Sequence, residues 1–148
     1  MSAALFVAEP PARYAMLPPL VVDCSVLCAV LFQEVERDEA VARLAGNDLH
    51  APTLIDYEVA SVALKKLRQG RRGDIENGLA QFSAVPLTVH GINLLQTLAL
   101  AERYALSAYD AAYLWLAADL KSPLVTFDRR LGAAAQQHLS TLDEDPAP

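Results

Sequence analysis

The chain has 148 residues, 53% of them hydrophobic, and its 12 basic and 18 acidic side chains give a net charge of −6. This length fits one domain that buries about two thirds of the surface its unfolded chain exposes, and the acidic balance argues against a protein that coats nucleic acid through overall charge. No apolar stretch approaches the ~20 residues of a membrane span, and the first residues lack the basic start of a secretory signal, so we expect a cytoplasmic protein.

Apolar patterning predicts strands that alternate with helices. Residues 1–19 hold four prolines and no amphipathic period, so we expect a flexible tail, dispensable up to residue 15. The expected strands cover 20–23, 48–51, 85–89 and 124–127, and the expected helices cover 25–33, 36–44, 53–69, 74–83, 92–104, 108–120 and 129–139. This alternation predicts an α/β sandwich with a mainly parallel sheet over residues 20–139. We expect residues 140–148 to form a disordered acidic tail.

The first strand ends in a carboxylate, Asp23, followed at once by Ser25 and a helix. In open parallel sheets ligands bind just beyond the carboxyl ends of the strands, which favours a functional role for Asp23. The alternative is that Asp23 caps the next helix, because Asp is a favoured N-cap residue.

Three further acids share this kind of position. Glu58 borders the apolar stripe of its helix, where a carboxylate is costly unless a cation neutralises it or it reaches water. Asp110 follows Ser107 by three residues, which also fits a capping box, and Asp128 follows the last strand, which also fits an N-cap. If Asp23, Glu58, Asp110 and Asp128 converge, their mutual repulsion raises their pKa values unless a cation is present. Hard oxygen ligands of this kind suit Mg²⁺ or Mn²⁺.

The other residue types with chemical potential give weaker signals. Cys24 and Cys28 lie one helical turn apart in an apolar stretch, which favours two inert buried thiols over a disulfide. The three histidines show no ligand spacing, which argues against a zinc site. One basic run is either an RNA-phosphate contact or a solvated helix end whose cations suit the helix dipole; it comprises Lys65, Lys66, Arg68, Arg71 and Arg72.

Four segments together resemble the PIN-domain ribonucleases, and among them the VapC-type toxins of toxin–antitoxin pairs. They are residues 21–27 (VVDCSVL), 51–60 (APTLIDYEVA), 107–113 (SAYDAAY) and 124–131 (LVTFDRRL), and the resemblance covers 16–139. It implies a PIN-like α/β/α sandwich and places the family's acidic quartet on Asp23, Glu58, Asp110 and Asp128. The family's hydroxyl positions fall on Ser25 and Thr126, and Cys24 stands where Thr is common.

The resemblance also implies a function. It predicts an Mg²⁺- or Mn²⁺-dependent endoribonuclease in which the four acids hold the metal and Ser25 and Thr126 orient them. It further implies a VapB-type antitoxin, a homodimer and an RNA substrate. A non-catalytic PIN-like module that binds RNA or a partner remains as an alternative. A phosphoacceptor receiver domain is disfavoured because Cys24 stands where a second acid is needed, and no glycine-rich turn supports a dinucleotide-binding fold.

Overall fold

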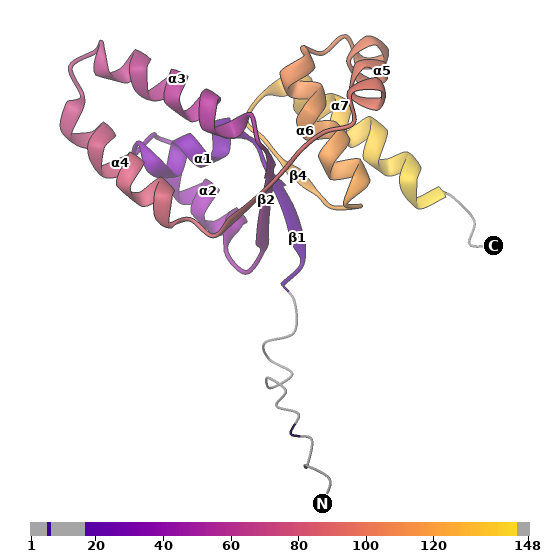
Figure 1. Ribbon diagram of the computed structural model, residues 1–148, viewed down its shortest axis with the longest axis horizontal. Coiled ribbons are helices and arrows are strands. Elements are labelled where there is room, and N and C mark those ends of the chain that lie inside the picture. The colour runs from indigo at the N-terminus through magenta and orange to yellow at the C-terminus, as the bar shows by residue number, and fades with distance from the viewer. Residues whose placement is uncertain (1–5, 7–16, 145–148) are drawn as a thin grey trace, which may run out of the picture.

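The computed structural model describes residue 6 and residues 17–144, and shows three layers (Figure 1). Helices α1–α4 cover one side of the sheet and α5–α7 cover the other. The elements are β1 (Pro19–Val22), α1 (Cys24–Leu31), α2 (Arg37–Leu44), β2 (Asp48–Pro52), α3 (Ile55–Leu67), α4 (Arg72–Ala84), β3 (Leu87–His90), α5 (Leu94–Tyr104), α6 (Ala108–Asp119), β4 (Leu124–Val125), α7 (Arg129–Ser140) and a 3₁₀ helix, η2 (Thr141–Glu144). The predicted α/β/α fold with a parallel sheet is confirmed.

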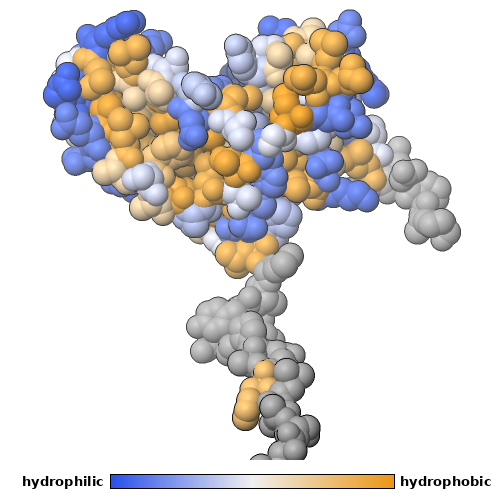
Figure 2. All heavy atoms as spheres, viewed as in Figure 1, coloured by the Kyte–Doolittle hydropathy of each residue, from blue (hydrophilic) through white to orange (hydrophobic). Residues whose placement is uncertain are grey.

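The four strands form one parallel sheet in the order β3-β2-β1-β4. Strand β1 is central: Val21 lies opposite His50 of β2 and Leu124 of β4. Val21 and Val22 are completely buried, as expected for a strand covered on both faces. Because all strands run in parallel, their carboxyl ends meet at one edge of the sheet. Figure 2 shows a notch in the molecule between the α1–α4 half and the α5–α7 half.

Close backbone contact fixes how α4 sits against α1. A Cβ atom on Gly78 of α4 would lie 2.6 Å from both the Leu31 carbonyl oxygen and the Phe32 ring. Nearby, Arg71 donates a hydrogen bond to the Phe32 carbonyl (2.9 Å). Only a residue without a side chain allows this approach, so Gly78 is a packing residue.

The structure corrects several local expectations. Helix α3 begins at Ile55 and not at residue 53: its N-cap is Leu54, without a side-chain cap bond, and the Thr53 amide donates to the His90 carbonyl (2.9 Å). Strand β3 starts at Leu87 and not at residue 85; just before it, the Leu87 amide donates to the Val85 carbonyl (2.8 Å). Strand β4 ends at Val125 and not at residue 127.

The expectations for the two ends of the chain stand differently. Residues 141–144, expected to be disordered, form η2 instead. Residues 1–5, 7–16 and 145–148 lie outside the described part, so the predicted tails there and the domain limits stay predictions. None of the described helices is long and apolar enough to cross a membrane.

Candidate active site

Asp23 lies at the junction of β1 and α1, and its carboxylate is not a helix cap. The residue occupies the N-cap position of α1, but its side chain makes no cap hydrogen bond. Instead, Asp23 Oδ2 accepts hydrogen bonds from Ser25 Oγ (2.6 Å) and Thr126 Oγ1 (2.8 Å). Asp23 is only 6% exposed, so these two hydroxyls hold a nearly buried carboxylate in one orientation. The capping alternative is therefore wrong for Asp23.

The two hydroxyls are themselves held by the backbone after β4. Ser25 Oγ accepts from the Phe127 amide (3.0 Å), and Thr126 Oγ1 accepts from the Asp128 amide (2.9 Å). Each hydroxyl uses its lone pair on an amide, so its proton is directed at Asp23. Ser25 and Thr126 thus lie where the resemblance expects residues that orient the acids.

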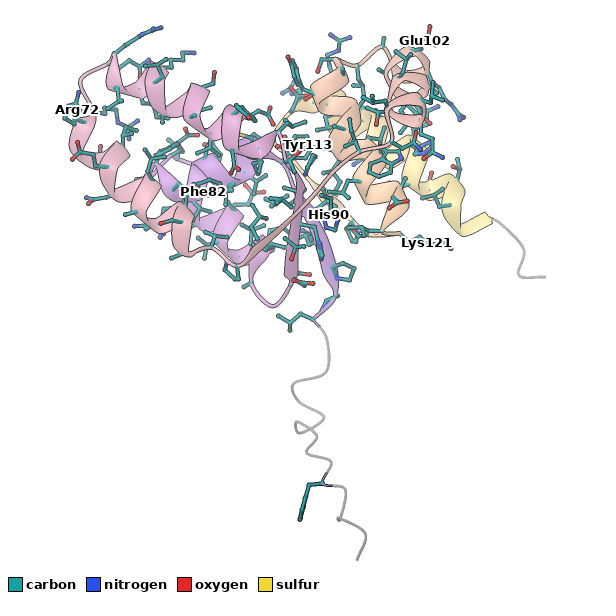
Figure 3. All side chains as sticks on the ribbon, viewed as in Figure 1. Arg72, Phe82, His90, Glu102, Tyr113 and Lys121 are labelled. Carbon is teal, nitrogen blue, oxygen red and sulfur yellow. The ribbon has the colours of Figure 1, made fainter. Side chains whose placement is uncertain are left out.

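Glu58 lies in the first turn of α3 and faces the other half of the molecule. The Tyr113 hydroxyl, from α6, donates to Glu58 Oε1 at 2.6 Å, and Figure 3 shows Tyr113 between the two halves. Burial raises the pKa of Glu58; the hydrogen bond from Tyr113 lowers it, and the negative charges of Asp23 and Asp110 raise it further. The edge-of-stripe position predicted from the sequence is therefore half-buried and close to two other acids.

Asp110 and Asp128 complete the acidic group. Burial raises the pKa of Asp110, and the charges of Asp128 and Asp23 add to this effect. The amide of Asp110 donates to Ser107 Oγ (3.1 Å), which caps α6 as the sequence indicated. Asp128 does cap its helix, because its Oδ1 accepts from the Leu131 amide (2.8 Å). Capping and a role in the acidic group are compatible for these two residues.

The donor set fits a hard divalent cation. Four carboxylates influence one another, and none forms an ion pair with a basic side chain among the described residues. The hydrogen bonds engage one oxygen each of Asp23, Glu58 and Asp128, so the other oxygen remains for a ligand. However, no three acidic, histidine or cysteine side chains in residues 17–144 already lie close enough to form a ligand group. A cation would have to draw the carboxylates together.

Tyr113 is the residue that sequence reasoning missed at this site. It is completely buried, and burial together with the hydrogen bond to Glu58 raises its pKa far above the ordinary range. The hydroxyl therefore stays a donor at any physiological pH. In the sequence, Tyr113 is typical of a core position in an apolar helix. Only its position three residues after Asp110, on a neighbouring part of the helix surface, could have indicated a role at the site.

The cysteines and histidines have different outcomes. Cys24 and Cys28 are buried, free thiols 3.4 Å apart, and their hydrogen bond and burial raise the pKa of Cys24, which confirms inert core residues. The histidines are less scattered than the sequence suggested, because neighbouring strands place His50 Nδ1 2.8 Å from His90 Nε2. His50 also contacts Asp48 (2.9 Å).

The basic run is largely used within the chain. Lys66 pairs with Glu34 (2.7 Å), Arg71 with Asp74 (3.4 Å) and Arg72 with Glu76 (3.5 Å). Lys65 and Arg68 are exposed and make no ion pair among the described residues. The predicted RNA contacts stay predictions, with Lys65 and Arg68 as the most available.

Comparison with known proteins identifies the family. The PIN domain family model matches residues 20–137. The chain belongs to the PIN-domain family. This PIN domain is 36% identical over 122 residues to Ribonuclease VapC3 of Mycobacterium tuberculosis, covering 79% of this chain and 89% of that protein. It is 35% identical over 120 residues to Ribonuclease VapC3 of Pyrobaculum aerophilum, covering 76% and 91%. The predicted resemblance is thus confirmed.

The solved structure of a similar protein agrees on the fold. The crystal structure of PAE2754 from Pyrobaculum aerophilum matches with a TM-score of 0.60 at 24% identity, covering 88% of this chain and 100% of that one. The four acids and two hydroxyls described above lie within the residues that the PIN family model matches.

Proposed function

We propose that this PIN domain is a metal-dependent endoribonuclease that acts in the cytoplasm as the toxin of a toxin–antitoxin pair. One observation carries the proposal: two hydroxyls orient Asp23 at the carboxyl edge of the sheet, where four carboxylates affect one another electrostatically and none forms an ion pair with a basic side chain among the described residues. The ribonuclease names of its relatives supply the substrate class. Asp23, Glu58, Asp110 and Asp128 are the proposed ligands of Mg²⁺ or Mn²⁺.

Each residue has a distinct proposed task. A bound metal ion supplies a nucleophilic water and charge neutralisation at the scissile phosphate. Asp23, which is nearly buried and accepts two hydrogen bonds from Ser25 and Thr126, fixes the position of the centre. Glu58 and Asp110, whose pKa values are raised, gain most from a cation, which favours their ionised forms.

Partner surfaces are proposed on α5. Leu94, Leu95 and Leu98 are exposed on this helix, and an apolar group of this kind is typical of a protein interface. We assign it to the homodimer. The VapB-type antitoxin is proposed to cover the acidic centre with a basic side chain, because the four acids form no ion pair with a basic side chain among the described residues.

Cleavage of a mixed pool of structured RNA with Mg²⁺ or Mn²⁺ tests the proposal. We expect EDTA, Asp23→Asn and Asp110→Asn each to abolish cleavage. Asp56→Asn is the matched control, because Asp56 is an exposed acid in the first turn of α3, and its cleavage should equal that of the wild type. Cleavage that survives Asp23→Asn in a folded protein would contradict the proposed centre.

Calorimetric titration with Mn²⁺ separates the proposal from a non-catalytic module. A nuclease binds Mn²⁺ through the acids, so Asp110→Asn should weaken binding while Asp56→Asn leaves it unchanged. A folded wild type that binds neither Mn²⁺ nor Mg²⁺ would overturn the proposed nuclease. It would favour a non-catalytic module that only binds RNA or a partner.

A further inference from the structure

Two exposed tyrosines immediately precede two of the four acids. Tyr57, before Glu58, is 80% exposed, and Tyr109, before Asp110, is 66% exposed. A large aromatic side chain gains little folding free energy when it stays in water. Two such side chains next to acids of one polar centre are available for a ligand with an aromatic face or an apolar edge.

We call Tyr57 and Tyr109, the exposed residues next to Glu58 and Asp110, the rim of the acidic centre. Successive helical residues point about 100° apart, so Tyr57 lies about 100° around α3 from Glu58, on the solvent side of the helix, whereas Glu58 faces Tyr113. On α6, Tyr109 lies one turn before Tyr113 and shares its face. Because Tyr113 reaches Glu58 of α3, Tyr109 is on the side of α6 that faces α3. The two tyrosines thus belong to the two halves that border the notch in Figure 2.

The negative charge of the acids restricts which parts of an RNA strand can contribute to binding. The phosphates of RNA are repelled by four carboxylates and by a net charge of −6 until a cation is bound. Much of the affinity must therefore come from parts of the substrate other than the phosphates. Bases are the parts of RNA with an aromatic face, and they are free to stack on protein only where they are unpaired.

We propose that Tyr57 and Tyr109 are stacking residues for unpaired RNA bases on the two sides of the phosphate that the acidic centre receives. This assignment rests on the proposed ribonuclease function and adds its mode of substrate binding. The exposed Arg68 lies eleven residues after Tyr57, about three turns along the same face, where it meets the phosphates of the same strand. Duplex RNA, whose bases stack on one another, is a poor ligand for this rim.

A third aromatic residue next to an acid does not belong to the rim. Phe127 precedes Asp128 and is partly exposed, but it lines a separate cavity of about 670 Å³ with Val26, Arg43 and Leu139. None of the residues that line this cavity comes from α3 or α6. This difference makes Phe127→Leu a useful control, because it changes an aromatic neighbour of an acid outside the rim.

Fluorescence anisotropy with a labelled single-stranded RNA of mixed sequence tests the proposal. EDTA prevents cleavage, so binding is measured separately from catalysis. Tyr57→Leu and Tyr109→Leu keep apolar bulk but lose the aromatic face, and each should weaken binding by about five- to 150-fold, the range of one base stack. Tyr57→Phe, Tyr109→Phe and Phe127→Leu should bind as the wild type does.

Two further ligands distinguish the possible outcomes. The Leu variants should bind a strand of abasic ribose phosphates with the same affinity as the wild type. A perfect RNA duplex should bind weakly to the wild type and to every variant. Equal binding of mixed-sequence RNA by wild type and Leu variants would overturn the proposal, as would a wild type that does not bind it. A Leu variant that changes only the oligomeric state in light scattering would overturn it in favour of a protein interface. Base-dependent binding without cleavage in Mg²⁺ would instead refute the nuclease and leave the stacking intact.

Discussion

Replacing Tyr113 with Phe removes one oxygen atom and with it the only hydrogen bond from α6 to Glu58. The ring fills the same completely buried space, so no cavity forms. A hydrogen bond to a charged group contributes about 1.5–3 kcal/mol. Because Glu58 is only half-buried, water replaces part of the lost bond, and we expect about 1.5 kcal/mol of lost stability, at the low end of this range.

The effect on metal binding should be larger than this loss of stability suggests. Without the Tyr113 donor, the pKa of Glu58 rises further, since that hydrogen bond lowers it, and the carboxylate is free to turn. Changes in residues that orient metal ligands cost about 10- to 100-fold in metal affinity. We expect Tyr113→Phe to weaken Mn²⁺ binding by that factor at neutral pH, and the deficit to shrink as the pH rises and Glu58 ionises.

Calorimetry with Mn²⁺ over a pH series, beside urea unfolding, measures both effects. Tyr104→Phe is the matched control, because the Tyr104 hydroxyl bonds to His138 Nδ1 (3.0 Å) on α7, away from the acids. It should lose stability without losing metal affinity. Tyr113→Phe with the metal affinity and pH dependence of the wild type would refute the role assigned to Tyr113.

Three further changes probe the packing and the electrostatics of the centre. Gly78→Ala should cost about 1–3 kcal/mol by overpacking in urea unfolding, while Gly73→Ala, with nothing within 4 Å of the new Cβ, should be neutral or slightly stabilising; equal effects would contradict the close approach of α4 to α1. Thr126→Val should cost about 2 kcal/mol, because it removes a donor to a charged, nearly buried carboxylate, and an unchanged unfolding midpoint would refute this. The pKa of Asp110 is raised above its ordinary 3.8, so the folded protein binds more protons than the unfolded one above that pH and loses stability as the pH rises from about 4 towards the raised pKa. Asp110→Asn should therefore raise the melting temperature of the metal-free protein at neutral pH, but not at pH near 4, and a decrease at neutral pH would refute this sign.

Local signals in the sequence were sufficient to predict the four strands to within two residues at each end, and the acids that follow the first and the last of them. Asp23 and Asp128 each end an apolar run, and such runs become the parallel strands whose carboxyl ends meet. Contacts between distant residues were harder to predict. Tyr113 and Glu58 are 55 residues apart, and their meeting depends on how α6 crosses the sheet. For Thr126, 103 residues from Asp23, only the family resemblance indicated a role.

Strand registers and ion pairs between elements could not be predicted from the sequence either, because they also join residues that are far apart along the chain. His50 and His90 meet because β2 and β3 are neighbours in one particular register, which no spacing along the chain reveals. Lys66 reads as part of a basic surface run, but the fold brings Glu34 within 2.7 Å of it. The charge pattern along a helix shows which basic side chains could bind a ligand. The neighbouring elements determine which of them are already paired with an acid of the same chain.

Metal binding and RNA binding should be coupled through α3 and α6. The acids do not yet form a compact ligand group, so a cation that binds Glu58 and Asp110 must draw these two helices together. Tyr57 and Tyr109 stand on the same helical turns as those acids and move with them. The coupling is reciprocal by thermodynamic linkage: if Mn²⁺ tightens the binding of single-stranded RNA by some factor, RNA must tighten Mn²⁺ binding by the same factor. Part of this coupling is direct attraction between the cation and phosphate; the part that disappears in Tyr57→Leu is the contribution of the stacked base.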